Sequence, residues 1–137
     1  MRSLVLDTNV LLSFLTDRDP SQQQLAEKLF EAAARGELRL IVPQIVLVEL
    51  TFVLRNLYQR SVEEIAETLS KALALPGVEP ADPTAWALVL ELWPRVVDGL
   101  PDALIAAVAK LGRHDGVATF DRRLARVLST IGVESHW

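Results

Sequence analysis

Apolar and polar positions form blocks of two lengths along the chain. Short apolar runs rich in Leu, Val and Ile predict buried strands, and longer segments with capping signals predict helices between them. We expect strands at residues 2–7, 38–43, 77–81, 116–120 and 132–137. We expect helices from Thr8 or Asn9 to about Thr16 and over residues 21–34, 44–58, 61–75, 82–93, 99–112 and 121–128. This alternation is typical of an α/β fold whose parallel sheet is covered on both faces.

Polar residues at the starts of several helices set their predicted boundaries. Ser21 is expected to cap the second helix. Ser61 and Glu64 have the spacing of a capping box, which predicts another helix start. Asp82 and Pro83 are expected to be the cap and first-turn residue of the helix that ends near residue 93. No repeat and no linker interrupts the pattern.

The composition predicts a single domain over residues 1–137, without a membrane segment. The chain contains no cysteine, which excludes disulfides, thiolate metal sites and a cysteine nucleophile. No apolar stretch approaches the roughly 18 residues that a membrane span needs. No signal peptide is evident at the start, and a cytoplasmic location is expected. The net charge of −4 argues against broad coating of nucleic acid, although eleven of the 14 basic residues are Arg.

Four acidic residues stand in otherwise uncharged surroundings: Asp7, Glu49, Asp102 and Asp121. An ionised carboxylate in an apolar setting is costly without a partner. Asp102 could be a first-turn acid that favours the helix dipole, and Asp121 could be a simple helix cap. Glu49 falls in the middle of a helix that reads as buried on most sides. Asp7, Asp102 and Asp121 lie at predicted strand ends or helix starts, on what would be the same edge of the sheet.

A shared divalent cation would explain all four acids at once. Converging carboxylates raise one another's pKa, and a cation removes that penalty. Oxygen ligands without a Cys or His cluster select hard ions, so Mg²⁺ or Mn²⁺ is expected. Such an ion supports hydrolysis of phosphodiesters. Thr8, Asn9 and Thr119 are candidates for orienting the carboxylates or the water molecules of the ion.

Four segments around these acids resemble, in order, the motifs of PIN-domain ribonucleases. They are "VLDTNVLL", "VELTFVL", "LPDALIAAVAK" and "VATFDRRL", and the resemblance covers nearly the whole chain. The chain looks most like the VapC-type toxins of toxin–antitoxin pairs. The resemblance implies a three-layer α/β/α sandwich with a central parallel sheet of about five strands. It also implies Mg²⁺- or Mn²⁺-dependent RNA cleavage, a homodimer and a small protein antitoxin as partner.

By motif match, the resemblance makes Asp7, Glu49, Asp102 and Asp121 the catalytic and metal-binding acids. It makes Asn9 the polar position after the first Asp. Asp98 is a candidate auxiliary ligand, with an exposed loop acid as the alternative. Family members with "T-R-D" at the last motif carry a basic residue where this chain has Phe120, and this difference leaves the core acid in place but bears on contacts with RNA.

Arginines near the acids are candidates for binding RNA phosphates, with a solvated helix face as the alternative. They are Arg122, Arg126 and Arg55. Trp86 and Trp93 lie on one side of a helix, a spacing that favours packing in the core or at a dimer seam over base stacking. His114 and His136 are interpreted as surface residues.

Rival functions fit less well. A phosphatase of the haloacid dehalogenase type would need a second Asp two positions after Asp7, where this chain has Asn9. A response-regulator receiver domain would need an acidic pair and a lysine that are not suitably placed. A PIN fold that binds RNA or protein without cutting it is the alternative from a different class.

Overall fold

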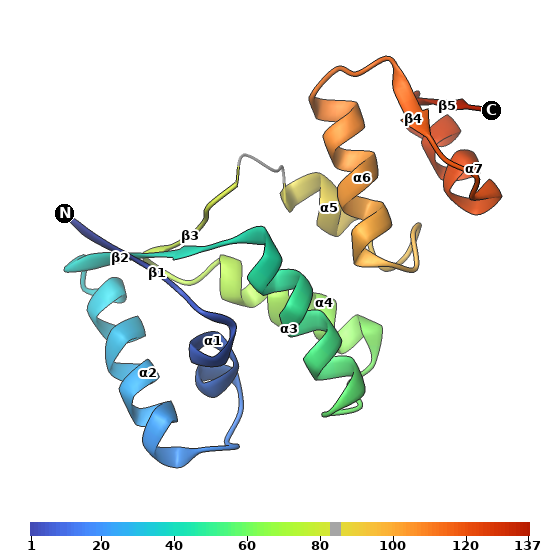
Figure 1. Ribbon diagram of the computed structural model, residues 1–137. Helices are drawn as coiled ribbons and strands as arrows, with labels where there is room; N and C mark the ends of the chain where they lie inside the picture. Colours follow the sequence, from blue (N-terminus) through green and yellow to red (C-terminus); the bar gives the residue numbers. More distant parts are fainter. Residues whose placement is uncertain (83–85) are drawn as a thin grey trace. The chain divides into compact units, whose positions relative to one another are not determined.

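The computed structural model describes residues 1–82 and 86–137, which fall into two units, Met1–Pro83 and Thr84–Trp137. The first unit contains a parallel three-stranded sheet in the order β1-β2-β3 (Figure 1). Its strands are β1 (Arg2–Val5), β2 (Leu38–Val42) and β3 (Val78–Pro80). Its helices are α1 (Thr8–Leu15), α2 (Pro20–Ala34), α3 (Gln44–Asn56) and α4 (Val62–Leu73).

The core of the first unit forms between the central strand β2 and the helices. Leu40 and Val42 of β2 are almost completely buried, as are Leu47 and Leu50 of α3. β2 hydrogen-bonds to a neighbour on each side, and Leu4 of β1 lies in register with Leu40. Pro43 follows β2 and serves as the N-cap of α3. The core therefore fixes where β1 ends and where α3 begins, which positions Asp7 and Glu49.

The second unit contains helices α5 (Trp86–Leu92), α6 (Leu100–Leu111) and α7 (Arg122–Thr130) and strands β4 (Gly116–Ala118) and β5 (Glu134–His136). The two strands pair in parallel, with Ala118 opposite His136. Trp86 and Trp93 are 6% and 2% exposed, so both rings belong to the core of this unit. The core-packing interpretation is confirmed for these tryptophans, and their rings are not available to form a dimer seam.

The α/β class is confirmed, since every strand in the described residues pairs in parallel and helices lie between successive strands. Three of these strands belong to the first unit and two to the second. The helix and strand positions follow the pattern of apolar runs in the sequence. Among the described helices, none is long and apolar enough to cross a lipid bilayer.

The start of α2 differs from the prediction. Asp19, not Ser21, is the N-cap, and its Oδ1 accepts a hydrogen bond from the backbone N of Gln22 at 3.1 Å. Pro20 then occupies the first turn, where its missing N–H costs no helical hydrogen bond. The Asp–Pro pair therefore begins the helix before Ser21 is reached.

The helix start predicted at Asp82 and Pro83 runs into residues 83–85, outside the described residues, so this cap stays a prediction. The described side-chain contact of Asp82 is with a different helix. Its Oδ2 accepts a hydrogen bond from the backbone N of Gln44 at 2.7 Å. Gln44 is the first residue of α3, whose N-cap Pro43 supplies no side-chain acceptor. Asp82 thus satisfies the exposed N–H end of α3 from a segment distant in sequence. Pro83 lies outside the described residues.

The capping box at the start of α4 is confirmed. The backbone N of Glu64 donates to Oγ of Ser61 at 3.1 Å, and the backbone N of Ser61 donates to Oε1 of Glu64 at 3.2 Å. The hydrogen bonds from Ser61 hold the pKa of Glu64 below its usual value. Near the end of α2, the Arg35 guanidinium lowers the pKa of Glu37 by hydrogen bonding and by its charge.

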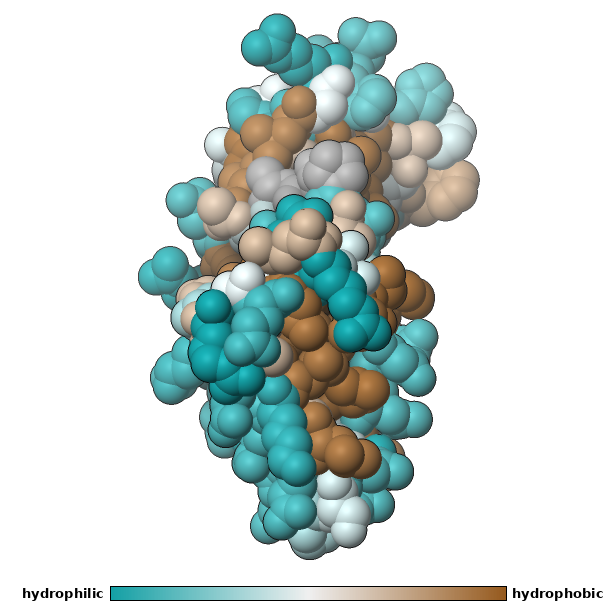
Figure 2. All heavy atoms as spheres, turned by 90° about the vertical axis from the view of Figure 1, so that its left-hand side faces the viewer, coloured by the Kyte–Doolittle hydropathy of each residue, from teal (hydrophilic) through white to brown (hydrophobic). Residues whose placement is uncertain are grey.

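Hydrophobic side chains also reach the surface of each unit. On the side that Figure 2 shows, they form a band over the first unit, bordered by hydrophilic residues. The most exposed large hydrophobic residues of that unit include Val5, Leu25 and Leu57, at 71%, 68% and 77%. In the second unit, Phe120 is 87% exposed and Trp137 is 75% exposed.

Candidate functional site

The carboxylates of Asp7 and Glu49 are both hydrogen-bonded to Thr8 in the first unit. Asp7 follows β1 as the N-cap of α1, and its Oδ1 accepts a hydrogen bond from the backbone N of Thr8 at 2.7 Å. The Thr8 hydroxyl donates to Oε2 of Glu49 on α3 at 3.1 Å. Because Thr8 is only 7% exposed, this hydroxyl needs a partner within the fold. Two acids far apart in the sequence are therefore tied to one buried residue.

Glu49 is exposed on α3, so the expectation of a buried position is wrong. Leu47 and Leu50 form the buried side of this helix. Ile45 and Phe52 lie four positions before and three positions after Glu49, which places all three on one helical face. Ile45 and Phe52 are 60% and 57% exposed. Because Ile45 and Phe52 are apolar although they face solvent, the sequence around Glu49 predicted a helix that is buried on most sides.

Asp102 and Asp121 stand at the starts of two helices in the second unit. Asp102 is in the first turn of α6 and partly exposed. Asp121 is the N-cap of α7, and its Oδ1 accepts hydrogen bonds from the backbone N atoms of Arg123 and Leu124 at 2.9 and 3.3 Å. The backbone N of Asp121 donates to Oγ1 of Thr119 at 3.0 Å. Both acids thus have the helix-terminal positions that the sequence indicated.

Asp98 lies in the exposed segment before α6. The Nη1 atom of Arg123 is 3.9 Å from its Oδ2, with the two side chains 83% and 93% exposed. A salt bridge this exposed contributes little to stability. The backbone carbonyl of Asp98 accepts a hydrogen bond from Nε1 of Trp93 at 3.2 Å. Asp98 therefore has the surroundings of an exposed loop acid, which was the alternative to an auxiliary ligand.

Three of the four motif acids use a single carboxylate oxygen within the described residues. Asp7 and Asp121 each accept through Oδ1, and Glu49 accepts through Oε2. In the same part of the chain, Asp102 has no hydrogen-bond or salt-bridge partner for its carboxylate. A carboxylate that is anchored by one oxygen presents the other in a fixed direction. These donors are all hard oxygen ligands, and they fit a Mg²⁺ or Mn²⁺ ion.

No three His, Asp or Glu side chains among residues 1–82 and 86–137 gather as a group that could hold a metal ion. Asp7 and Glu49 belong to the first unit, whereas Asp102 and Asp121 belong to the second. The shared cation therefore stays a prediction.

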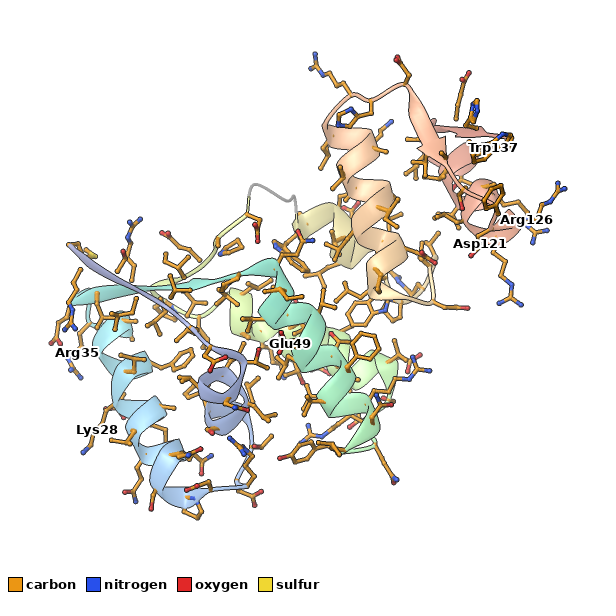
Figure 3. The ribbon with its side chains drawn as sticks, in the orientation of Figure 1. Lys28, Arg35, Glu49, Asp121, Arg126 and Trp137 are labelled. Atoms are coloured by element: carbon orange, nitrogen blue, oxygen red, sulfur yellow. The ribbon has the colours of Figure 1, made fainter. Side chains whose placement is uncertain are left out.

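The three arginines expected to contact RNA are exposed. Arg122 and Arg126 lie on α7, where Figure 3 labels Arg126, and Arg55 lies in the last turn of α3. In the described part of the chain, none of the three forms an ion pair. Their charges are thus open to an external anion, and their contacts with RNA stay a prediction.

Asn9 lies at an apolar groove between α1 and α2. The groove has a volume of about 380 Å³, and its lining includes Val10, Leu25 and Leu29. Asn9 is exposed, and its side chain makes no hydrogen bond within the described residues. A role in orienting the carboxylates stays a prediction for Asn9, whereas Thr8 and Thr119 contact the predicted acids or their backbone.

A stacked aromatic pair beside Asp121 was not predicted from the sequence. The rings of Phe120 and Trp137 have centroids 4.7 Å apart and planes inclined by 13°. The ring of His136 is tilted by 58° against Trp137, also at 4.7 Å. An aromatic residue between an apolar strand and a helix-capping Asp is the sequence signal that indicates an exposed ring here.

The PIN domain family model matches residues 4–128 of the chain. The match covers most of both units, so the chain belongs to the PIN domain family. PIN domains are generally nucleases that typically use divalent metal ions and act on nucleic acid. No curated protein matches the sequence.

Proposed function

We propose that the chain is a Mg²⁺- or Mn²⁺-dependent endoribonuclease and the toxin of a type II toxin–antitoxin pair. Membership of the PIN domain family supports the nuclease class. The observation that carries the proposal is the pair of hydrogen bonds at Thr8, which ties the carboxylates of Asp7 and Glu49 to one buried residue. Asp7 caps α1, and the same buried Thr8 also holds one oxygen of the exposed Glu49.

In this proposal the chain forms one PIN domain, and Asp7, Glu49, Asp102 and Asp121 are the acids that would bind the ion. Asp98 is the candidate for an auxiliary ligand. When bound, the ion would stabilise negative charge on the phosphate and lower the pKa of a water molecule. A donor set made only of carboxylates supports this choice of ion, because hard cations prefer oxygen ligands.

The chain's own residues would orient the acids and bind the RNA. Thr8 fixes one oxygen of Glu49, and Thr119 holds the backbone of Asp121 at the start of α7. Such contacts are typical of the residues that orient metal ligands. Arg122 and Arg126 would bind phosphates on either side of the scissile one, with Arg55 as a further candidate.

The toxin role is supported by the resemblance of the four motifs to VapC-type toxins. It implies a cytoplasmic protein that forms a homodimer and is silenced by a small antitoxin. Expression of the chain should then arrest growth, and co-expression of a small neighbouring reading frame with a DNA-binding amino-terminal segment should restore it. Growth that is unaffected by the chain would contradict the toxin role but not the nuclease activity.

RNA cleavage in the presence of Mn²⁺ tests the nuclease directly. Asp7→Asn should lower the rate about a hundredfold or more, the order expected when a group that stabilises transition-state charge is lost. Asp17→Asn is the matched control, because Asp17 is an exposed acid near the other end of α1. It should cleave like the wild type. If the wild type binds RNA but does not cut it with any divalent metal, the alternative of a silent RNA-binding PIN fold is correct.

A further inference from the structure

Two large aromatic side chains face solvent at the same edge of the second unit. Phe120 is 87% exposed and Trp137 is 75% exposed, although their rings stack face to face at 4.7 Å. This separation is ordinary for an offset-stacked pair. The stack protects little of either ring from water, so each keeps most of an apolar face available to a third planar group.

The parallel strands β4 and β5 bring this pair to the end of the sheet where Asp121 lies. Ala118, the last residue of β4, lies in register with His136, the last residue of β5. Phe120 follows β4 and directly precedes Asp121, and Trp137 directly follows His136. In parallel α/β folds, ligands bind at the carboxyl ends of the strands. The aromatic pair is thus built onto the same strand ends as a predicted catalytic acid.

Two exposed arginines near the pair favour a polyanion over an apolar protein surface, although the exposed acids Asp121 and Glu134 also lie in this unit. Arg122 and Arg126 lie on α7, within the first turns after Asp121, and both are exposed. Neither forms an ion pair within the described part of the chain. Figure 3 labels Arg126, Asp121 and Trp137 in this unit. Exposed aromatic rings next to unpaired arginines form the combination that binds single-stranded nucleic acid, through base stacking and phosphate contacts.

We propose that Phe120 and Trp137 form a stacking platform for one unpaired nucleobase of the RNA. The proposal rests on the proposed function, because it assumes that RNA is bound at this edge. The platform would hold a nucleotide next to the scissile phosphate, near the proposed metal-binding acid Asp121. Stacking requires a base that is not paired in a duplex, so the platform selects single-stranded segments.

Binding without cleavage tests the platform independently of catalysis. A short unstructured RNA is titrated into the full chain in EDTA, and anisotropy of the RNA and tryptophan fluorescence are recorded. Trp137 is the exposed tryptophan, whereas Trp86 and Trp93 are buried, so stacking of a base should quench the emission of Trp137. Replacing successive nucleotides by an abasic unit should lower affinity about tenfold at one position.

Substitutions of Phe120 test whether its ring stacks on the RNA base. Phe120→Leu should lower affinity for intact RNA about tenfold, with little further loss when the critical base is absent. Phe120→Tyr keeps the ring and should bind like the wild type. Circular dichroism should show that both variants fold, since Phe120 is exposed.

The outcomes separate the two proposals. If the wild type binds RNA but neither the abasic unit nor Phe120→Leu changes the affinity, the platform is refuted and the endoribonuclease remains. A protein partner would then be the better explanation of the exposed rings. If the wild type binds no RNA in EDTA, the platform is refuted, and cleavage with Mn²⁺ then decides the endoribonuclease. Loss of cleavage by Asp7→Asn together with unchanged stacking supports both.

Discussion

Replacing Thr8 by Val tests whether the Thr8 hydroxyl orients Glu49 for metal binding. Valine keeps the shape of the side chain but removes the hydroxyl that donates to Oε2 of Glu49 at 3.1 Å. A hydrogen bond to a charged group contributes about 1.5–3 kcal/mol. Glu49 is exposed, so water replaces part of the interaction. We therefore expect the free energy of unfolding to fall by about 1.5 kcal/mol, at the lower end of that range.

The larger effect should fall on metal binding. Removing a residue that orients a metal ligand typically costs 10- to 100-fold in metal affinity or activity. Thr8→Val should accordingly weaken Mn²⁺ binding about tenfold, or about 1.4 kcal/mol. Isothermal titration with Mn²⁺ measures this change, and RNA cleavage at saturating RNA should fall in parallel. Thr8→Ser restores the hydroxyl and should recover most of the affinity.

Thr16→Val is the matched control for this substitution. Thr16 is 6% exposed, and Thr8 is 7% exposed. Its hydroxyl donates to the backbone carbonyl of Leu12 at 2.8 Å, not to a carboxylate. The control should lose some stability but should keep the wild-type Mn²⁺ affinity. If Thr8→Val and Thr16→Val lose equal stability and both bind Mn²⁺ normally, the hydroxyl of Thr8 is structural and the reasoning is refuted.

Three further predictions concern capping and RNA binding. Asp82→Ala removes the acceptor for the backbone N of Gln44 and should destabilise the chain by about 1 kcal/mol in urea unfolding; an unchanged midpoint would contradict the cap. The pKa of Glu64 is lowered by Ser61 in the folded state, so its stabilisation is present above the ordinary glutamate pKa and lost as pH falls through the folded value. Glu64→Gln should therefore lose less stability than the wild type between pH 7 and pH 3 in thermal unfolding, and equal losses would show that the capping box does not carry this pH dependence. Arg126→Ala should weaken RNA binding across sequences and reduce the salt slope by about 1, whereas an unchanged slope would show that Arg126 does not contact phosphate.

Much of the fold follows from local signals in the sequence. The apolar runs that become β2 and β4 each begin after a turn and end just before a helix. Ser61 with Glu64 and the Asp121 cap define helix starts through neighbours within three residues. Such contacts can be predicted from the sequence because both partners lie in one short segment. The role of Asp82 at Gln44 was missed because its partner lies in a distant segment that only the folded sheet brings near.

The sequence named candidate site residues but not their contacts. The sequence singled out Asp7, Glu49 and Thr8, and the structure adds the hydrogen bond that connects Thr8 to Glu49. The exposure of Glu49 was misjudged because Ile45 and Phe52 are apolar residues that nevertheless face solvent on the same side of α3. An apolar residue type indicates the tendency to be buried, whereas the face of the helix that is buried depends on what packs against it.

The most direct test of the metal site is a crystal soaked in Mn²⁺ and measured near the manganese absorption edge. We expect an anomalous peak coordinated by carboxylate oxygens of Asp7, Glu49, Asp102 and Asp121. A second crystal of Asp7→Asn treated in the same way should show a weaker peak or none. A strong peak held by other residues, or a full-strength peak in Asp7→Asn, would contradict the assignment of these acids to a common ion.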